Sequence, residues 1–221
     1  MLYSNMSKPL IVPPIVHFAR RPPFVDILKY EQVPHVTVRN FAPQVPGIVA
    51  SWRESADNCL LGLFPQKSTS RTRKGKENEI TTSHLKLATS FFKCHWCQEP
   101  ISYPRILMHG CLRDKVLNEE ESGKDKAEHV DANLHSVWNQ MSFWYGTEWN
   151  EGNNQVTFDD EASGFARVIV QACGKDPDKT TFDEMNDIDA RIECLRCSKK
   201  GQNSKRLVMN WTTAVINFLR V

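Results

Sequence analysis

The spacing of cysteine and histidine residues constrains this chain more than any other feature. The stretch from Phe91 to Cys111 ("FFKCHWCQEPISYPRILMHGC") contains three of the seven cysteines and two of the seven histidines. A second C-x-x-C pair follows at Cys194 and Cys197. Two thiolates at this spacing converge on one point, and zinc requires four ligands in a tetrahedron. The pattern therefore predicts a fold that is stapled by Zn²⁺.

One candidate ligand set is local and consists of Cys94, Cys97, His109 and Cys111. Eleven residues separate Cys97 from His109, which is enough for a hairpin or for a strand and a turn. This spacing is close to that of a small zinc finger. The spacing of His109 and Cys111 is tighter than the usual three to five residues between the last two ligands of a finger. An alternative is therefore a site that only one of these two residues binds.

A second candidate ligand set joins the two C-x-x-C pairs across the chain: Cys94, Cys97, Cys194 and Cys197. Residues 98–193 would then be a large insertion in a four-thiolate site. An apolar residue precedes each pair at the same offset ("FKCHWC" and "IECLRC"). This similarity indicates two equivalent units or two halves of one site, and it does not choose between them.

Disulfides and redox chemistry compete with zinc for these cysteines. The N-terminus does not have the pattern of a signal peptide, so we expect an intracellular protein, cytoplasmic or nuclear, in which thiols stay reduced. A thioredoxin-like role needs a C-x-x-C at a helix N-terminus within a βαβ unit, and Pro100 follows the first pair too closely. We expect Cys59 and Cys173 to be core residues. Of the scattered histidines His17, His35, His84, His129 and His135, we expect most to lie at the surface.

The recognisable catalytic motifs are absent from the sequence, so we expect no enzyme. There is no glycine-rich phosphate loop, nucleophile elbow, kinase signature or paired-histidine motif. A formal net charge of +2 argues against nucleic-acid binding over the whole chain, although the basic cluster at 71–76 favours it locally. No apolar run approaches the ~20 residues of a membrane helix, so we expect no membrane partner.

Composition divides the chain into four parts. Residues 1–23 hold five prolines and are expected to form an extended arm, because proline fixes φ and removes a backbone donor. Residues 24–64 show patterns of short strands and then a helix at roughly 46–64, a lead-in that we expect to pack on the zinc region. Residues 65–80 are basic, rich in Ser and Thr, and typical of a flexible linker. Residues 81–221 form the zinc-knuckle region, with a charged loop at 113–132.

Two further helices are predicted within this last part. Asp159 and Asp160 precede an apolar stripe that ends before Gly174, a natural helix stop. The segment "TFDE" has the spacing of a capping box, with Thr181 as the cap and Glu184 reaching back. Before the first C-x-x-C, "TTSHLKLATSFFKC" fits a short helix followed by a strand. The expected fold class is α+β: an irregular zinc-stapled domain with short strands, two or three short-to-medium helices and long loops.

The sequence also resembles a known family, the C-terminal region of the F-box-containing proteins that are expanded in mushroom-forming fungi. Four blocks carry this resemblance in order: "PGIVASWRESADNCLLGLF", "LATSFFKCHWCQEPISYPRILMHGC", "FARVIVQACGKDPDKTTFDEMNDIDARIECLRC" and "VMNWTTAV". The resemblance implies a non-catalytic zinc-binding module that binds a protein partner, with ubiquitin-ligase components among the partners. No F-box is recognisable before residue 24, so recruitment to a ubiquitin ligase is not expected of this chain. The alternatives are a zinc-finger-like nucleic-acid-binding protein and a thiol redox protein.

Overall fold

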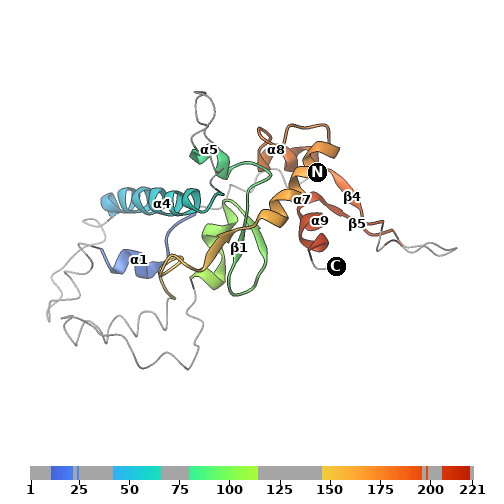
Figure 1. Ribbon diagram of the computed structural model, residues 1–221. Coiled ribbons are helices and arrows are strands. Elements are labelled where there is room, and N and C mark those ends of the chain that lie inside the picture. The colour runs from blue at the N-terminus through green and yellow to red at the C-terminus, as the bar shows by residue number, and fades with distance from the viewer. Residues whose placement is uncertain are drawn as a thin grey trace, which may run out of the picture. The chain divides into compact units, whose positions relative to one another are not determined.

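A computed structural model describes residues 11–21, 24, 42–65, 80–113, 146–195, 198 and 206–219 (Figure 1). Short helices alternate there with short antiparallel strands, so the fold class is α+β, as the sequence predicts. The chain divides into two compact units, Met1–Ala56 with Leu107–Gln155 and Asp57–Ile106 with Val156–Val221. The strands expected between residues 25 and 41, most of the linker at 65–80 and nearly all of the charged loop at 113–132 lie outside the described residues.

The first unit begins with helix α1 (Ile15–Ala19), in the part of the chain expected to be an extended arm. The prolines do not prevent this helix because they stand outside it. Pro14 is the N-cap residue, where a missing N–H breaks no helical hydrogen bond. The helix buries Val16, His17 and Ala19, so this stretch is packed rather than extended.

The long helix α4 (Val45–Gly62) follows a 3₁₀ turn, η1 (Ala42–Gln44). It confirms the helix predicted at roughly 46–64. Trp52, Ala56 and Leu60 recur every four residues on one face, and each is less than 5 % exposed. This spacing is the helical period that the sequence pattern indicated.

The second unit contains a three-stranded antiparallel sheet in the order β2-β1-β3. The short helix α5 (Thr82–Leu85) leads into the central strand β1 (Phe91–Cys94), as predicted. β1 pairs with β2 (Pro100–Ser102) on one side and with β3 (Val156–Phe158) on the other. The sheet therefore places Cys94 at the end of its central strand.

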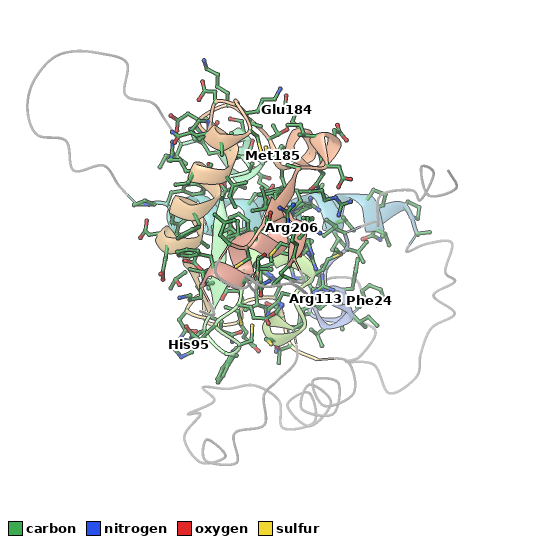
Figure 2. The ribbon with its side chains drawn as sticks, turned by 90° about the vertical axis from the view of Figure 1, so that its right-hand side faces the viewer. Phe24, His95, Arg113, Glu184, Met185 and Arg206 are labelled. Atoms are coloured by element: carbon green, nitrogen blue, oxygen red, sulfur yellow. The ribbon has the colours of Figure 1, made fainter. Side chains whose placement is uncertain are left out.

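Three helices and a second small sheet complete this unit: α7 (Asp160–Ala172), α8 (Phe182–Ile188), α9 (Trp211–Phe218), and the antiparallel pair β4 (Arg191–Glu193) and β5 (Val208–Asn210). Helix α9 packs against α7 and against both strands (Figure 1). Met185 of α8 is fully buried in the apolar core, whereas its neighbour Glu184 is exposed (Figure 2). The core cluster is formed by Ala88, Phe91, Ala162, Ala166, Ile169, Val170, Met185, Trp211 and Val215.

The predicted helix starts are confirmed in atomic detail. The Asp159 carboxylate accepts a hydrogen bond from the Ala162 N–H and caps α7. The Thr181 hydroxyl accepts from the Glu184 N–H, and the Glu184 carboxylate accepts from the Thr181 N–H at 2.7 Å, which makes a capping box. Gly174 has φ +72°, the left-handed conformation that ends a helix and that glycine adopts without steric cost.

Candidate metal centre

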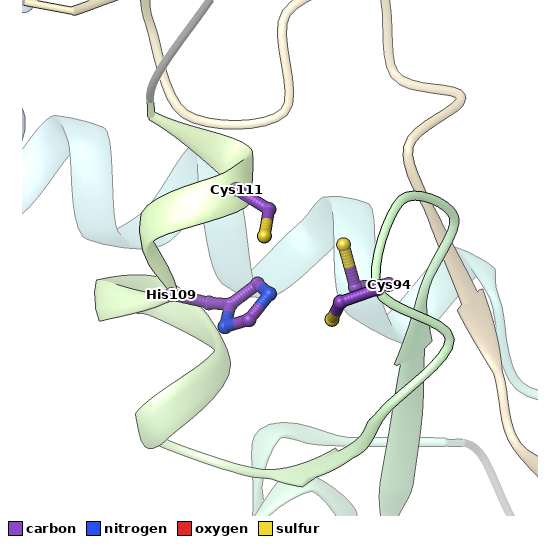
Figure 3. A group of neighbouring side chains, drawn as sticks. Cys94, His109 and Cys111 are labelled. Carbon is purple, nitrogen blue, oxygen red and sulfur yellow. The ribbon is translucent and has the colours of Figure 1, made fainter. Parts of the chain in front are cut away.

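Four side chains of one short segment converge on a common point. The ligand atoms of Cys94, Cys97, His109 and Cys111 all lie within 4.8 Å of one another and can hold a metal ion. Figure 3 shows the imidazole of His109 and the thiol groups of Cys94 and Cys111 turned towards the same space. The structure therefore brings together the local set of four residues that the sequence predicted, including both members of the tight His-x-Cys pair.

The first two ligands are held by a tight turn that follows β1. The Cys94 carbonyl accepts a hydrogen bond from the Gln98 N–H at 2.9 Å, and the Cys94 N–H donates to the Glu99 carbonyl at 3.5 Å. Gln98 has φ +57°, and its side-chain amide donates to the His95 carbonyl. The left-handed residue reverses the chain directly after Cys97 and allows β2 to pair with β1.

The other two ligands lie on successive 3₁₀ turns, η2 (Arg105–Met108) and η3 (Gly110–Leu112). His109 separates these turns in an extended conformation, with φ −67° and ψ 124°. The Leu112 N–H donates to the His109 carbonyl at 3.1 Å. Since Leu107 and Leu112 are fully buried on either side, the backbone that carries His109 and Cys111 is anchored at both ends.

Arg113, which is not a ligand, stabilises the 3₁₀ turns that carry His109 and Cys111. Its Nη2 donates to the Leu107 carbonyl at 2.8 Å, and its Nε donates to the same oxygen at 3.2 Å. Nη2 also donates to the Val12 carbonyl at 2.8 Å, which ties the turn to the segment before α1. Neither Arg113 nor Gln98 was predicted from the sequence, because neither residue belongs to a ligand motif; only their positions next to the ligands could have drawn attention to them.

The size of the group matches a tetrahedral zinc site after a small contraction. Zinc–sulfur bonds of ≈ 2.3 Å in a tetrahedron place ligand atoms about 3.8 Å apart. The upper separation of 4.8 Å is about 1 Å larger, a difference that side-chain rotation can close. The donor set also fits, since thiolates and a neutral imidazole favour zinc over magnesium or calcium.

Four protein ligands leave no open position on a tetrahedral ion. Structural zinc sites are closed in this way, whereas catalytic sites keep one position for water or substrate. Cys94 is buried and the other three residues are half-buried, so the group lies at the edge of the packed region. The arrangement can therefore staple the hairpin to the 3₁₀ turns.

The second C-x-x-C pair begins with the same backbone pattern. The Cys194 N–H donates to the Leu207 carbonyl at 3.0 Å, and its carbonyl accepts from the Ser198 N–H at 2.9 Å. Cys94 is the last residue of β1 and Cys194 comes directly after β4, and the carbonyl of each accepts from the N–H of the residue four positions later. The similarity of the two pairs noted in the sequence thus extends to the described backbone.

The structure does not group Cys194 with Cys94. In the part of the chain that the structure describes, the ligand atoms around Cys94 come from the local segment and not from the second pair. Cys197 lies outside the described residues. A metal site at Cys194 and Cys197 therefore stays a prediction.

Among the described residues, no disulfide joins Cys59, Cys94, Cys97, Cys111, Cys173 or Cys194. Cys59 and Cys173, which were expected in the core, are half-buried, and Cys173 packs against the core cluster of the second unit.

Comparisons with known proteins identify no relative: no protein-family model, curated protein or solved structure matches this chain. Over the described residues, no helix has both the length and the apolar character needed to cross a membrane.

Proposed function

We propose that this chain is a non-catalytic zinc protein whose metal-stapled turn serves in protein binding. The observation that carries the proposal is the convergence of Cys94, Cys97, His109 and Cys111 within 4.8 Å. A closed set of three thiolates and one imidazole fits structural zinc, and it leaves no position for a substrate or an activated water. Binding of structural zinc supplies apparent free energies of about 10–16 kcal/mol, as much as the whole stability of an ordinary domain.

The protein-binding part of the proposal rests on the tip of the first knuckle. Trp96 lies between the two cysteines, is 41 % exposed, and is flanked by the exposed ring of His95 at a centroid distance of 5.8 Å. A large aromatic side chain held outward by a tight turn is the type of residue that dominates protein interfaces. The resemblance to the C-terminal region of fungal F-box proteins supports the same role.

The zinc proposal is tested by elemental analysis of the purified protein beside Cys94→Ser, Cys194→Ser and Cys173→Ser. We expect zinc to be lost from the first site in Cys94→Ser and to be retained in full by the control Cys173→Ser. A further zinc that disappears only in Cys194→Ser would establish a second site. Loss of one zinc in both Cys94→Ser and Cys194→Ser would instead indicate the four-thiolate site across the chain.

Zinc content also distinguishes the proposed zinc protein from a thiol redox protein, in which Cys94 and Cys97 would form a disulfide. The redox alternative predicts metal-free protein with a reversible Cys94–Cys97 disulfide. Free-thiol counts before and after mild oxidation would then change by two per chain, while the zinc content would be zero. That result would overturn the proposed structural zinc site.

Ubiquitin-ligase components are the partners that the family resemblance suggests, and they are tested directly. The test is whether a purified cullin-ligase adaptor retains this chain. Retention that is lost in Trp96→Ala but kept in Cys173→Ser would show that the adaptor is a partner. Failure to retain it would confine the proposal to partners of another kind.

Nucleic-acid binding is the second candidate, and exposed Trp96 is the observation that favours it. Aromatic side chains stack on bases in single-stranded RNA and DNA, with about 1–3 kcal/mol per stacked base. The near-neutral net charge of +2 argues against extensive phosphate contacts. Binding to single-stranded oligonucleotides that weakens with salt and is lost in Trp96→Ala would favour this function over protein binding.

A further inference from the structure

A buried histidine in the first unit has no role in the metal centre. His17 of α1 is only 6 % exposed, although most of the histidines outside residues 91–111 were expected at the surface. Its Nδ1 lies 3.8 Å from Oε1 of Glu148. Among the described residues, its buried Nε2 has no hydrogen-bond partner. A buried ring with one unsatisfied nitrogen is sensitive to the addition of a proton.

The surroundings of this ring are apolar on one side and charged on the other. The indole of Trp52, from α4, meets the imidazole in an edge-on arrangement at a centroid distance of 6.5 Å. Glu148 provides the negative charge, while Arg20 and Arg21 provide positive charge from the end of α1 and the residue beyond it. The ring is therefore enclosed by three parts of the first unit: α1, α4 and the segment at 146–155.

Glu148 is not available to His17 alone. Nη1 of Arg20 lies 3.7 Å from the same oxygen of Glu148, and 3.1 Å from Oε1 of Glu151. Since Arg20 lies beside the same carboxylate, the attraction that Glu148 offers to a protonated His17 is reduced. Burial lowers the pKa of His17; Glu148 raises it, and Arg21 and Arg20 lower it further, with a net downward shift.

We propose that His17 is a proton-sensitive latch for the segment 11–21, which stays docked on α4 and on the 146–155 segment while the ring is neutral and is released when the ring is protonated. Protonation would place a positive charge and a second N–H donor in a buried site that offers Nε2 no acceptor. The hydrogen bond from the Arg113 guanidinium to the Val12 carbonyl is the second anchor of this segment, and the guanidinium does not change its charge in this pH range. The latch proposal does not rest on the proposed metal site, although the Arg113 side chain contacts both segments.

The direction of the pH dependence follows from the two states. The released segment binds a proton with the ordinary histidine pKa of about 6.5, and the docked segment binds it only at lower pH. Docking is therefore strongest above about pH 6.5 and weakens as the pH falls towards the lowered pKa of the docked state. Because one proton is involved, the docking equilibrium constant falls by at most about tenfold per pH unit.

The test is hydrogen exchange of the backbone amides of residues 11–21 between about pH 7.5 and about pH 5, corrected for the intrinsic pH dependence of exchange. We expect protection of this segment to fall over this range in the wild type and to become independent of pH in His17→Phe. Helix α7 is the internal reference, and zinc content measured in the same samples separates latch opening from metal release. Constant protection in the wild type, or an unchanged pH dependence in His17→Phe, would overturn the proposal.

Two further measurements keep the test decisive if His17→Phe folds poorly. The imidazole resonances of His17 in wild-type protein report its protonation directly, and they should titrate below the ordinary histidine range together with the loss of protection. Glu148→Gln removes the group that favours the charged ring in the docked state, so the total loss of protection between about pH 7.5 and about pH 5 should be at least as large as in wild type. A smaller loss of protection in Glu148→Gln would contradict the assigned electrostatics.

Discussion

The hydrogen bond of Trp211 offers a sharp test of how the second unit is held together. Trp211 is 2 % exposed and lies between Phe91 and Phe182, at centroid distances of 6.3 Å and 5.0 Å. Its indole Nε1–H donates to Oδ1 of Asn186 at 3.0 Å. Among the described residues, Asn186 Oδ1 is the acceptor for the Trp211 Nε1–H. Replacing Asn186 by alanine removes this acceptor and leaves the aromatic contacts of Trp211 in place.

The expected loss of stability is set by two opposing terms. A buried donor without a partner costs about 1–3 kcal/mol. Alanine is a better helix former than asparagine by about 0.5 kcal/mol, and this gain in α8 offsets part of the loss. Because Asn186 itself is exposed, water can reach the end of the indole, so we take the lower part of the range. Asn186→Ala should therefore lower the free energy of unfolding by about 1 kcal/mol, or about 2–4 °C in Tm.

Urea unfolding with a matched control measures this loss. Asp187→Ala is the control, since this exposed neighbour gains the same helix propensity without touching Trp211, and it should not lower the urea midpoint. In a Trp211→Phe background, Asn186→Ala should no longer destabilise the protein. An equal loss in both backgrounds, or no loss at all, would refute the role given to this hydrogen bond.

Three further changes have expected outcomes. Met185→Ala removes a fully buried side chain from the second unit's core and should cost about 2–5 kcal/mol in urea unfolding; a loss below 1 kcal/mol would contradict this packing. Thr181→Ala should cost about 1 kcal/mol by breaking the capping box. Hydrogen bonds from the Thr181 N–H and hydroxyl lower the pKa of Glu184. The stability that these bonds confer is therefore complete above the ordinary glutamate pKa and declines as the pH falls through the lowered pKa. A loss of stability in Thr181→Ala that stays constant in acid would contradict this pH dependence. Arg113→Gln should weaken zinc binding about tenfold in a chelator competition, since ligand-supporting contacts have effects of this order, and unchanged affinity would exclude this role of Arg113.

The helices that the sequence predicted correctly are those with local signals. Helix α7 has an acidic cap and an apolar stripe, and α8 has both halves of its capping box within four residues. Such patterns depend on neighbouring residues only, so they can be identified without knowledge of the fold. The local ligand set of the metal centre was predictable for the same reason, because all four residues lie within one short segment.

The features that the sequence did not reveal depend on contacts between distant residues. The pairing of β1 with β3 joins Phe92 to Phe158, and no local pattern specifies that partner. The helix α1 was missed because the prolines around it suggested an extended arm, and the burial of His17 depends on Trp52 and Glu148. These contacts are supplied by tertiary packing, which overrides local preference.

The most direct test of the central claim is X-ray absorption at the zinc edge, measured on the purified Cys194→Ser variant so that the second pair cannot contribute a complete site. We expect that zinc is retained, with three sulfur atoms at about 2.3 Å and one nitrogen at about 2.0 Å. The outer-shell scattering of an imidazole should be present and should disappear in His109→Ala. Loss of zinc from Cys194→Ser, or a zinc shell without an imidazole, would contradict a centre formed by Cys94, Cys97, His109 and Cys111.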